Sequence, residues 1–229
     1  MKKDNYIVSI FMLTYNQENL IAQAVEGVLM QKTNFNYQLV IGEDCSTDKT
    51  RDICVEYSIK YHDKIKLLPK LDNNIGLISN YIRTIKECDG KYIAICDGDD
   101  YWIDEFKLQK QIDFLEKNRE FDIVYSNCVK LDYKGNLFKR EICNNINNVD
   151  FDSLIFDNCI PAPTAVFRNL QELKQLPVWI KDLPYGDWPT YLWVLNNGGK
   201  IYGLDDFTAV YRTSIGVSAK IRSKLSNLF

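Results

Sequence analysis

Short apolar runs that alternate with stretches of helical periodicity constrain the fold of this chain more than any other feature. Four runs have the length and composition of strands: 6–13 (YIVSIFML), 38–42, 65–68 and 92–96 (YIAIC). The first and the last are nearly continuous in apolar residues, as expected of strands buried on both faces. Helical stretches that begin near Asn16, Asp48 and Leu77 separate the runs. This order predicts an α/β fold in which helices flank a mainly parallel, Rossmann-like sheet.

Polar clusters follow three of the four predicted strands at their carboxyl ends. These clusters are Thr14-Tyr15-Asn16, Glu43-Asp44 and Asp97-Gly98-Asp99-Asp100. Open α/β sheets bind ligands beyond the carboxyl ends of their strands. The sequence therefore predicts that the three clusters converge at one edge of one sheet. The loop Asn74-Ile75-Gly76 and Asn80 either line the same crevice or form a plain helix start.

The acidic cluster after the fourth strand is the strongest chemical signal. Asp97, Asp99 and Asp100 repel one another unless a cation lies between them. Two carboxylates at i and i+2 beyond a strand suit a hard divalent ion, which takes oxygen ligands. An exposed Asp-Gly turn that closes the strand is the alternative.

Glu43, Asp44 and Tyr15 have properties suited to a nucleoside. A carboxylate accepts a hydrogen bond from a nucleobase N–H or a ribose hydroxyl, since both groups are donors. Tyr15 offers an aromatic face. The alternative is that Glu43 or Asp44 caps the helix that follows. The first strand is not followed by a Gly-x-Gly-x-x-Gly or Walker sequence, so a dinucleotide site or a P-loop is unsupported.

The second half is less regular and contains one further candidate. A helix is predicted over 106–118, a strand over 123–131 and a turn at 134–136, while prolines interrupt the rest. Asp187 lies in the segment Tyr185-Gly186-Asp187-Trp188-Pro189, which begins another helix. Asp187 either caps that helix or serves as a general base at its start.

Composition limits the class of protein. With 229 residues, 46% of them hydrophobic and 26% charged, the chain is typical of a single globular domain, here 1–229. A net charge of −3 provides no basic field, so we expect no nucleic-acid partner. The single histidine, His62, excludes His-rich metal cages and argues against a Ser-His-Asp triad. Seven cysteines without a Cys-x-x-Cys pair or a secretion signal predict a cytoplasmic protein.

Membrane contact, if the protein makes any, is expected from the surface. Every apolar run is shorter than the ~18 residues of a membrane-spanning helix. The tail 220–229 mixes basic and apolar residues, a composition that can lie peripherally on the anionic inner face of a cell membrane. A frayed or packed terminus is the alternative.

In this order, the segments resemble the family 2 glycosyltransferases of GT-A fold. The resemblance covers nearly the whole chain and rests on VSIFMLTYNQE, LVIGEDCSTDKT, NNIGLISN, GKYIAICDGDDYW with KLQKQIDFLE, TAVFRN, GDW and VYR. The DGDDYW block in this context is highly specific, whereas each other segment alone is weak. The resemblance implies a nucleotide-sugar-binding half over 1–104 and a mixed acceptor-binding half over 105–229.

The resemblance also implies roles for individual residues. The nucleotide of a nucleotide-sugar donor would be bound by Thr14, Tyr15, Asn16, Glu43 and Asp44, with Asn74 and Asn80 beside the same crevice. Asp97-Gly98-Asp99 matches the Asp-x-Asp motif of the family, which handles ribose, sugar and metal, and Asp99 would anchor Mn²⁺ or Mg²⁺. Asp187 falls where the family places its catalytic base.

This chain departs from the family at two places. Many relatives carry a histidine shortly after the Tyr-Arg pair, whereas Tyr211-Arg212 is followed here by Thr213-Ser214. Either Arg212 serves the diphosphate instead, or the affinity for metal is lower. Glu43 stands where many relatives have aspartate, a difference that the role tolerates.

We therefore expect an inverting glycosyltransferase that acts in bacterial surface polysaccharide synthesis. It would transfer one sugar from a nucleotide-sugar, in particular a UDP-sugar, to a glycan or lipid-linked acceptor. A sugar-nucleotide pyrophosphorylase would need a Gly-rich phosphate loop, and 12–16 has none. A non-catalytic nucleotide- or glycan-binding module would bind UDP without hydrolysing any UDP-sugar. A phosphoacceptor receiver domain shares the acidic strand end, but the chain length and the Asp187 segment argue against it.

Overall fold

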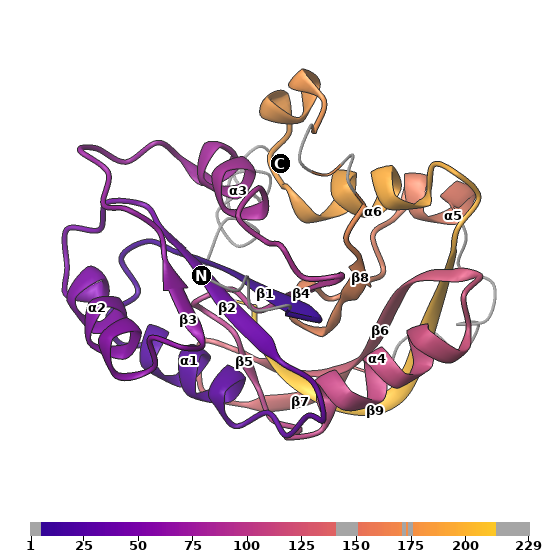
Figure 1. The fold of residues 1–229 in the computed structure, drawn as a ribbon, viewed down its shortest axis with the longest axis horizontal. Coiled ribbons are helices and arrows are strands. Elements are labelled where there is room, and N and C mark those ends of the chain that lie inside the picture. The colour runs from indigo at the N-terminus through magenta and orange to yellow at the C-terminus, as the bar shows by residue number, and fades with distance from the viewer. Residues whose placement is uncertain (1–5, 141–150, 171–172, 174–175, 214–229) are drawn as a thin grey trace.

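One mixed sheet forms the centre of the computed structural model, which describes residues 6–140, 151–170, 173 and 176–213 (Figure 1). The strands are β1 (Val8–Thr14), β2 (Tyr37–Glu43), β3 (Ile65–Leu67), β4 (Tyr92–Ile95), β5 (Tyr101–Trp102), β6 (Phe121–Leu131), β7 (Leu137–Arg140), β8 (Val166–Arg168) and β9 (Lys200–Arg212). Their order in the sheet is β3-β2-β1-β4-β8-β6-β9-β5, and β7 pairs with β6. The first four strands are mutually parallel, whereas β8 is antiparallel to both β4 and β6. The predicted parallel sheet with a mixed second half is therefore confirmed.

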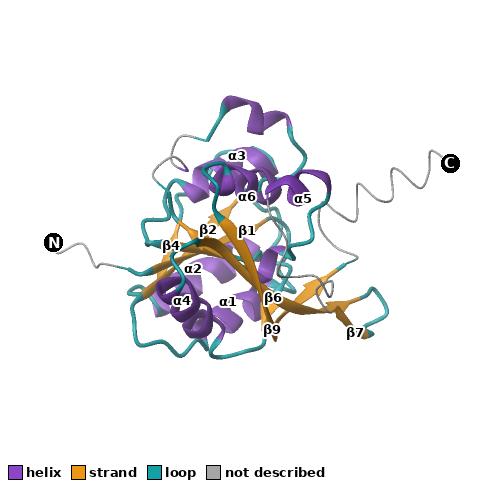
Figure 2. Ribbon diagram, turned by 90° about the vertical axis from the view of Figure 1, so that its right-hand side faces the viewer, coloured by secondary structure: helices purple, strands orange, loops and turns teal. Residues whose placement is uncertain are grey.

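Helices cover both faces of the sheet (Figure 2). They are α1 (Ile21–Leu29), α2 (Thr50–Lys60), α3 (Leu77–Ile85), α4 (Lys107–Lys117), α5 (Phe151–Phe156) and α6 (Asp187–Leu195), with short 3-10 turns at η2 (Ala162–Thr164) and η4 (Val178–Asp182). The helices α1, α2 and α4 pack on one face, and α3, α5 and α6 pack on the other. Each face therefore has its own apolar core.

The strand β1 contributes to both cores because its side chains alternate between the two faces. Ile10 and Met12 belong to the core beneath α1 and α4, while Phe11 and Leu13 belong to the core beneath α3 and α6. All seven residues of β1 are buried. This arrangement explains why the run is apolar at successive positions rather than at alternate ones.

The first helix begins at Ile21 rather than near Asn16, where the sequence pattern predicts its start. Asn16 has a left-handed backbone with φ of 52°. Its side-chain Oδ1 instead accepts a hydrogen bond from the backbone N–H of Thr47 (2.8 Å). Asn16 therefore ties the loop after β1 to the loop after β2. By contrast, Asp48 lies at the expected helix start, where its Oδ1 accepts the backbone N–H of Thr50 (2.9 Å).

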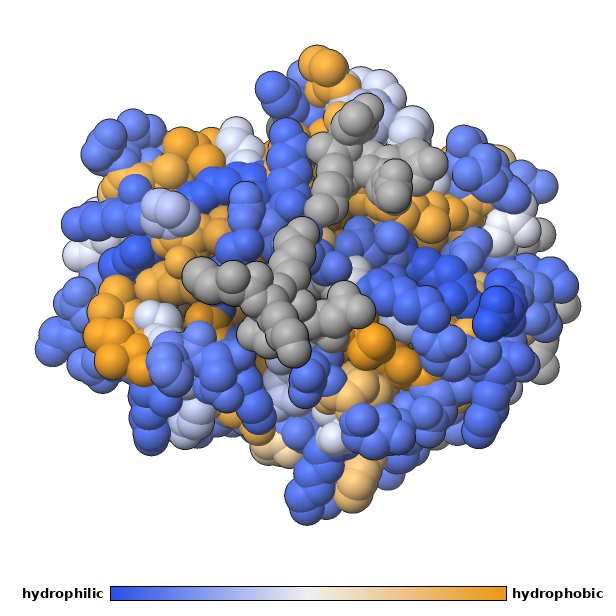
Figure 3. Space-filling view, viewed as in Figure 1, coloured by the Kyte–Doolittle hydropathy of each residue, from blue (hydrophilic) through white to orange (hydrophobic). Residues whose placement is uncertain are grey.

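Polar side chains occupy much of the face shown in Figure 3, and orange apolar groups are interspersed among them. Within the described ranges, every helix is too short or too polar to cross a lipid bilayer. The Asn-rich segment 144–148, whose composition is typical of a loop, and the basic–apolar tail at 220–229 lie outside the described residues. The prediction of peripheral membrane contact by this tail therefore stays a prediction.

Candidate active site

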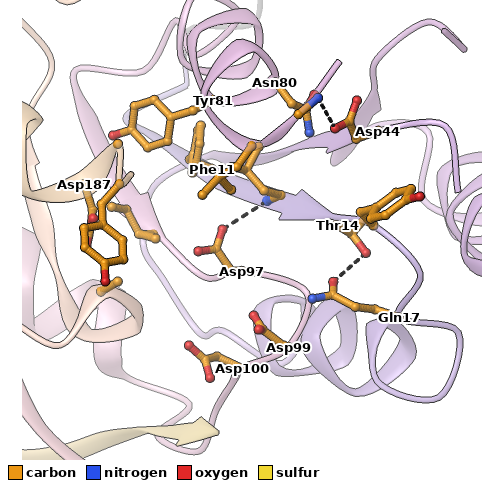
Figure 4. Close-up of a pocket in the computed structure, with 18 of the residues that line it drawn as sticks. Phe11, Thr14, Gln17, Asp44, Asn80, Tyr81, Asp97, Asp99, Asp100 and Asp187 are labelled. Atoms are coloured by element: carbon orange, nitrogen blue, oxygen red, sulfur yellow. Dashed lines mark hydrogen bonds between the residues drawn. The ribbon is translucent and has the colours of Figure 1, made fainter. Parts of the chain in front are cut away.

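A pocket of about 350 Å³ lies beyond the carboxyl ends of β1 and β4 and is closed on its far side by the start of α6. Eight of the predicted site residues line it: Thr14, Tyr15, Asp44, Asn74, Asn80, Asp97, Asp99 and Asp187. The strand-end clusters therefore do converge, and the segment at Asp187 joins them from the second half of the chain (Figure 4). The other four predicted residues, Asn16, Glu43, Gly98 and Arg212, are absent from the lining.

The acidic loop after β4 is held against the end of β1 by the backbone. Asp97 Oδ1 accepts the backbone N–H of Leu13 (3.2 Å), and Gly98 N–H donates to the carbonyl of Leu13 (2.8 Å). Gly98 lies so close to β1 that an added Cβ would come 2.9 Å from the Cβ of Thr14. Thr14 in turn donates from its hydroxyl to Gln17 Oε1 (2.7 Å). Gly98 thus permits the close approach that sets Asp97 and Asp99 in the pocket.

The carboxyl groups of this loop are destabilised as anions. Burial, with a further contribution from the neighbouring Asp99, raises the pKa of Asp97 to about 8. Burial also raises the pKa of Asp99 and, more strongly, that of Asp100. Five aspartates line the pocket, and Lys, Arg and His are missing from the described lining. A cation that enters the pocket would therefore relieve strong mutual repulsion.

Arg212, at the end of β9, lies behind the acidic loop. Its backbone N–H donates to Asp100 Oδ1 (2.8 Å), and its Nη1 donates to the backbone carbonyl of Asp99 (2.6 Å). Its Nη2 donates to Gln23 Oε1 (2.5 Å), and its guanidinium lies 4.8 Å from the centre of the Tyr101 ring. In this arrangement the side chain of Arg212 is engaged by protein groups and supports the acidic loop from behind.

Asp44 organises the loop that precedes α3. Its carboxylate accepts the backbone N–H groups of Ile75 (2.9 Å) and Gly76 (3.0 Å), together with Asn74 Nδ2 (2.9 Å). Burial raises the pKa of Asp44, and the two backbone hydrogen bonds partly oppose that shift. Gly76 has a φ of 84°, in the left-handed region that favours glycine. Asp44 therefore both lines the pocket and fixes one of its walls.

Glu43 and Asn80 support the same wall from inside the protein. Glu43 is fully buried, and its Oε1 accepts the backbone N–H of Ser46 (2.6 Å) while its Oε2 lies 3.5 Å from Arg51 Nη1. Asn80 Nδ2 donates to the carbonyl of Gly42 at the end of β2 (2.7 Å). Glu43 thus fits the alternative that it stabilises the turn before α2.

Asp187 is the first residue of α6 and faces the pocket from the side opposite β1 (Figure 4). Burial raises the pKa of its carboxyl group, while the backbone N–H groups of Trp188 and of Asp187 itself oppose the shift. Free N–H groups at a helix start stabilise an anion. Asp187 therefore combines partial desolvation with local stabilisation of its ionised form, a combination that suits a proton acceptor.

The residues that the structure describes contain no group of three His, Cys, Asp or Glu side chains arranged to hold a metal ion. Asp97 and Asp99 nevertheless supply oxygen atoms of the kind that Mg²⁺ and Mn²⁺ prefer. An ion bound here would have to take its remaining ligands from water or from a substrate.

A family model described as "Glycosyl transferase family 2" matches residues 9–172, which include the three strand-end clusters. The chain belongs to glycosyl transferase family 2. An uncharacterized protein of Mycobacterium tuberculosis (strain ATCC 25618 / H37Rv) is 31% identical over 208 residues, which are 90% of this chain and 58% of that protein. An Escherichia coli relative, "UDP-Glc:alpha-D-GlcNAc-diphosphoundecaprenol beta-1,3-glucosyltransferase WfgD", is 36% identical over 54% of this chain and 46% of its own length.

Solved glycosyltransferases share the fold of this family 2 chain. S. aureus TarS 1-349 in complex with UDP-GlcNAc matches with a TM-score of 0.66 and 20% identity, covering 91% of this chain and 59% of TarS. The mannosyltransferase PcManGT from Pyrobaculum calidifontis, in complex with GDP-Man and Mn²⁺, matches with a TM-score of 0.66 and 17% identity, covering 91% of this chain and 57% of PcManGT. The GT-A fold is thereby confirmed, and the chain spans under two thirds of each of these proteins.

The pocket of this family 2 chain also contains residues that sequence reasoning missed. These residues include Gln17, Tyr81, Tyr185, Gly186 and Tyr211. Tyr185 and Gly186 are adjacent to Asp187 and could have been found by extending that segment. Tyr81 follows Asn80 but has the pattern of a core residue, because it is buried between the sheet and α6.

Proposed function

We propose that this enzyme transfers a sugar from a UDP-sugar to a hydroxyl group of a glycan or lipid-linked acceptor, with inversion at the anomeric carbon. One observation carries the proposal: Asp97 and Asp99 at the end of β4 line the same pocket as Asp187 at the start of α6. Such a pocket has one acidic pair suited to a cation and a separate carboxylate suited to a proton. Surface polysaccharide synthesis is the proposed setting, supported by the acceptor in the name of WfgD.

The residues of the pocket fit a divalent cation. A diphosphate entering a pocket lined by five aspartates, without a basic side chain in the described lining, would be repelled unless a cation accompanied it. Asp99, with Asp97 beside it, would hold Mn²⁺ or Mg²⁺. When bound, the ion neutralises the charge that grows on the departing nucleoside diphosphate.

The other side chains of the pocket would bind the nucleoside of the donor and activate the hydroxyl group of the acceptor. The wall formed by Thr14, Tyr15, Asp44 and Asn74 would hold the nucleoside, with Asn80 behind it. Asp187 takes the proton of the acceptor hydroxyl as its oxygen forms a bond to C1 of the sugar. The bond from C1 to the diphosphate breaks on the opposite face, so the configuration at C1 inverts and no covalent enzyme intermediate is formed.

A nucleotide-sugar panel tests this function. We expect UDP and at least one UDP-sugar to raise the melting temperature in the presence of Mn²⁺, because a ligand that binds only the folded state stabilises it. The enzyme should release UDP from that UDP-sugar, whereas a non-catalytic module would bind UDP without turnover. Stabilisation by GDP-mannose alone would contradict the proposed donor.

Two variants separate the proposed roles of the acids. Asp187→Asn should retain Mn²⁺-dependent UDP binding but lower transfer by about 10²-fold or more, in the range typical of general base catalysis. Asp99→Asn should weaken UDP binding only when Mn²⁺ is present. Asp182→Asn, at an exposed position in η4, is the matched control and should behave like the wild type. Near-normal transfer by Asp187→Asn would remove Asp187 as the base.

A further inference from the structure

We infer that Tyr81 is a positioning residue for Asp187, an inference that rests on the proposed function of Asp187 as the base. Tyr81 belongs to α3, on the donor side of the pocket, and Asp187 begins α6 on the opposite side. Two separate contacts connect Tyr81 to Gly186, the residue immediately before Asp187. One contact is made by the hydroxyl group of Tyr81 and the other by its ring.

The hydroxyl contact is a chain of two hydrogen bonds. Tyr81 donates from its phenol to Thr190 Oγ1 (3.0 Å), across 109 residues of sequence. Thr190 donates from the same hydroxyl to the backbone carbonyl of Gly186 (2.8 Å). Tyr81 and Thr190 are both buried, so water does not compete effectively for these groups. These two hydrogen bonds therefore fix the first turn of α6, which starts at Asp187, relative to α3.

The ring contact concerns the backbone of Gly186. A Cβ placed on Gly186 would lie within 2.7 Å of three ring carbons of Tyr81, which is closer than carbon atoms approach one another. The backbone of Gly186 therefore lies close against the ring of Tyr81. Any other residue at 186 would push the start of α6 away from α3. Because Asp187 is the next residue, the Tyr81 ring sets how far its carboxylate reaches into the pocket.

The other side of Tyr81 rests on the donor half of the fold. Its ring centre lies 4.7 Å from that of Phe11 in β1, with the two rings tilted by 55°. The preceding residue, Asn80, is hydrogen-bonded to Gly42 at the end of β2. Tyr81 thus transmits the position of β1 and β2 to α6. A base held in this way keeps its geometry relative to a donor bound at the ends of the same strands.

Tyr191 provides a matched control on the same helix. It is fully buried and close enough to Asp187 for that charge to raise the pKa of its phenol, yet its hydroxyl has no hydrogen-bond partner among the described residues. Tyr191→Phe and Tyr81→Phe therefore make the same chemical change at two buried tyrosines beside Asp187. Only the change at Tyr81 removes a hydrogen bond to α6.

Steady-state kinetics of the full chain tests the inference. UDP release from UDP-glucose, UDP-galactose and UDP-GlcNAc would be followed with Mn²⁺, together with UDP affinity by calorimetry. We expect Tyr81→Phe and Thr190→Val each to lower kcat about 5- to 20-fold without changing UDP affinity, because misplacing a catalytic group slows the chemical step. The double variant should be no slower than the worse single variant. Thr190→Ser should restore kcat, and Tyr191→Phe should leave it unchanged.

The outcomes distinguish this inference from the proposed function. If Asp187→Asn retains transfer, the base assignment fails and the positioning role fails with it. If Asp187→Asn abolishes transfer while Tyr81→Phe and Thr190→Val behave like Tyr191→Phe, only the positioning role is overturned. The positioning role is also overturned if Tyr81→Phe and Thr190→Val lower kcat, UDP affinity and melting temperature together, since that pattern indicates a general loss of structure.

Discussion

Arg212 donates a hydrogen bond from its guanidinium to the backbone carbonyl of Asp99 (2.6 Å), although 113 residues separate the two in sequence. The backbone of Arg212 simultaneously holds the carboxylate of Asp100 (2.8 Å). The end of β9 therefore determines where the acidic loop lies. This relationship gives the second half of the chain a direct part in forming the proposed cation site.

Removing the Arg212 side chain should loosen that loop. We expect Arg212→Ala to weaken Mn²⁺-dependent UDP binding about 10-fold or more, because hydrogen bonds from charged groups contribute about 1.5–3 kcal/mol. Arg212→Lys should retain part of the affinity. Calorimetry with UDP and Mn²⁺ measures the change, and the exposed Arg119→Ala is the control. Unchanged affinity in Arg212→Ala would show that the loop does not depend on β9.

Gly98 should be intolerant of any side chain. A Cβ there would come 2.5 Å from Gln17 Oε1 and 2.9 Å from both Cβ and Oγ1 of Thr14. Because two of these atoms belong to a short, buried threonine, the acidic loop would have to move away from β1. We expect Gly98→Ala to cost about 1–3 kcal/mol of unfolding free energy, as is typical of overpacking, and to weaken UDP binding.

Chemical denaturation at pH 7 measures the cost of this substitution. Gly98→Ala combined with Gln17→Ala removes the Oε1 contact but leaves both Thr14 contacts. The double variant should therefore remain destabilised. Full recovery of stability in the double variant would contradict the assignment of the clash to Thr14.

Asp97 should make the ligand-free protein less stable as the pH rises through the acid range. Its pKa of about 8 in the folded chain lies above the ordinary value of 3.8. The folded state therefore binds more protons than the unfolded state between about pH 4 and pH 8, and its unfolding free energy falls as the pH rises across that window.

Asp97→Asn should remove the part of this slope that Asp97 contributes, while Asp99 and Asp100, whose pKa values are also raised, keep theirs in both proteins. At pH 8 the variant should be more stable than the wild type by up to about 5 kcal/mol, since the pKa of Asp97 is raised from 3.8 to about 8 and each pKa unit corresponds to about 1.4 kcal/mol. Below pH 4 the advantage should vanish. Urea denaturation in EDTA at pH 4, 6 and 8 measures the difference, with the exposed Asp72→Asn as control. Parallel pH curves for wild type and Asp97→Asn would refute the assignment.

The sequence predicts the donor half of this fold well for a physical reason. Strands β1, β2 and β4 are short, buried on both faces and followed within two residues by polar side chains, so local pattern alone locates their ends. The parallel order then brings Asp44 and Asp99 to one pocket without knowledge of any side-chain contact.

Other features depend on contacts that local pattern does not encode. Asn16 has the composition of a helix cap, but its hydrogen bond to Thr47 of the next loop holds it outside the helix. Strand β9 is not apparent in the sequence because Asp205-Asp206 interrupts its apolar pattern, and its register with β6 shifts near Asn127. Tyr81 looks like any core aromatic until α6 is packed against it. Each of these features requires the tertiary structure.

Lys107 should affect stability in a separate, more alkaline range. Its side chain is fully buried, its Nζ lies 2.6 Å from Gln111 Oε1, and the same Nζ lies 4.4 Å from the centre of the Trp102 ring. Burial lowers its pKa from 10.5 to about 7, and the nearby Cys96 and Asp104 only partly oppose this shift. The unfolded chain therefore binds more protons than the folded chain between about pH 7 and pH 10.5, so Lys107 makes the unfolding free energy rise with pH in that window.

Comparison of Lys107→Met with the wild type isolates this contribution. The buried Cys96 thiol, whose pKa is raised, gives the opposite slope at higher pH and is present in both proteins. From pH 7 to pH 9 the stability of the wild type relative to Lys107→Met should increase by about 2–3 kcal/mol, at about 1.4 kcal/mol per pH unit. Urea denaturation at pH 7, 8 and 9 measures it, with the exposed Lys117→Met as control. A constant difference across these pH values would mean that Lys107 stays charged in the folded core.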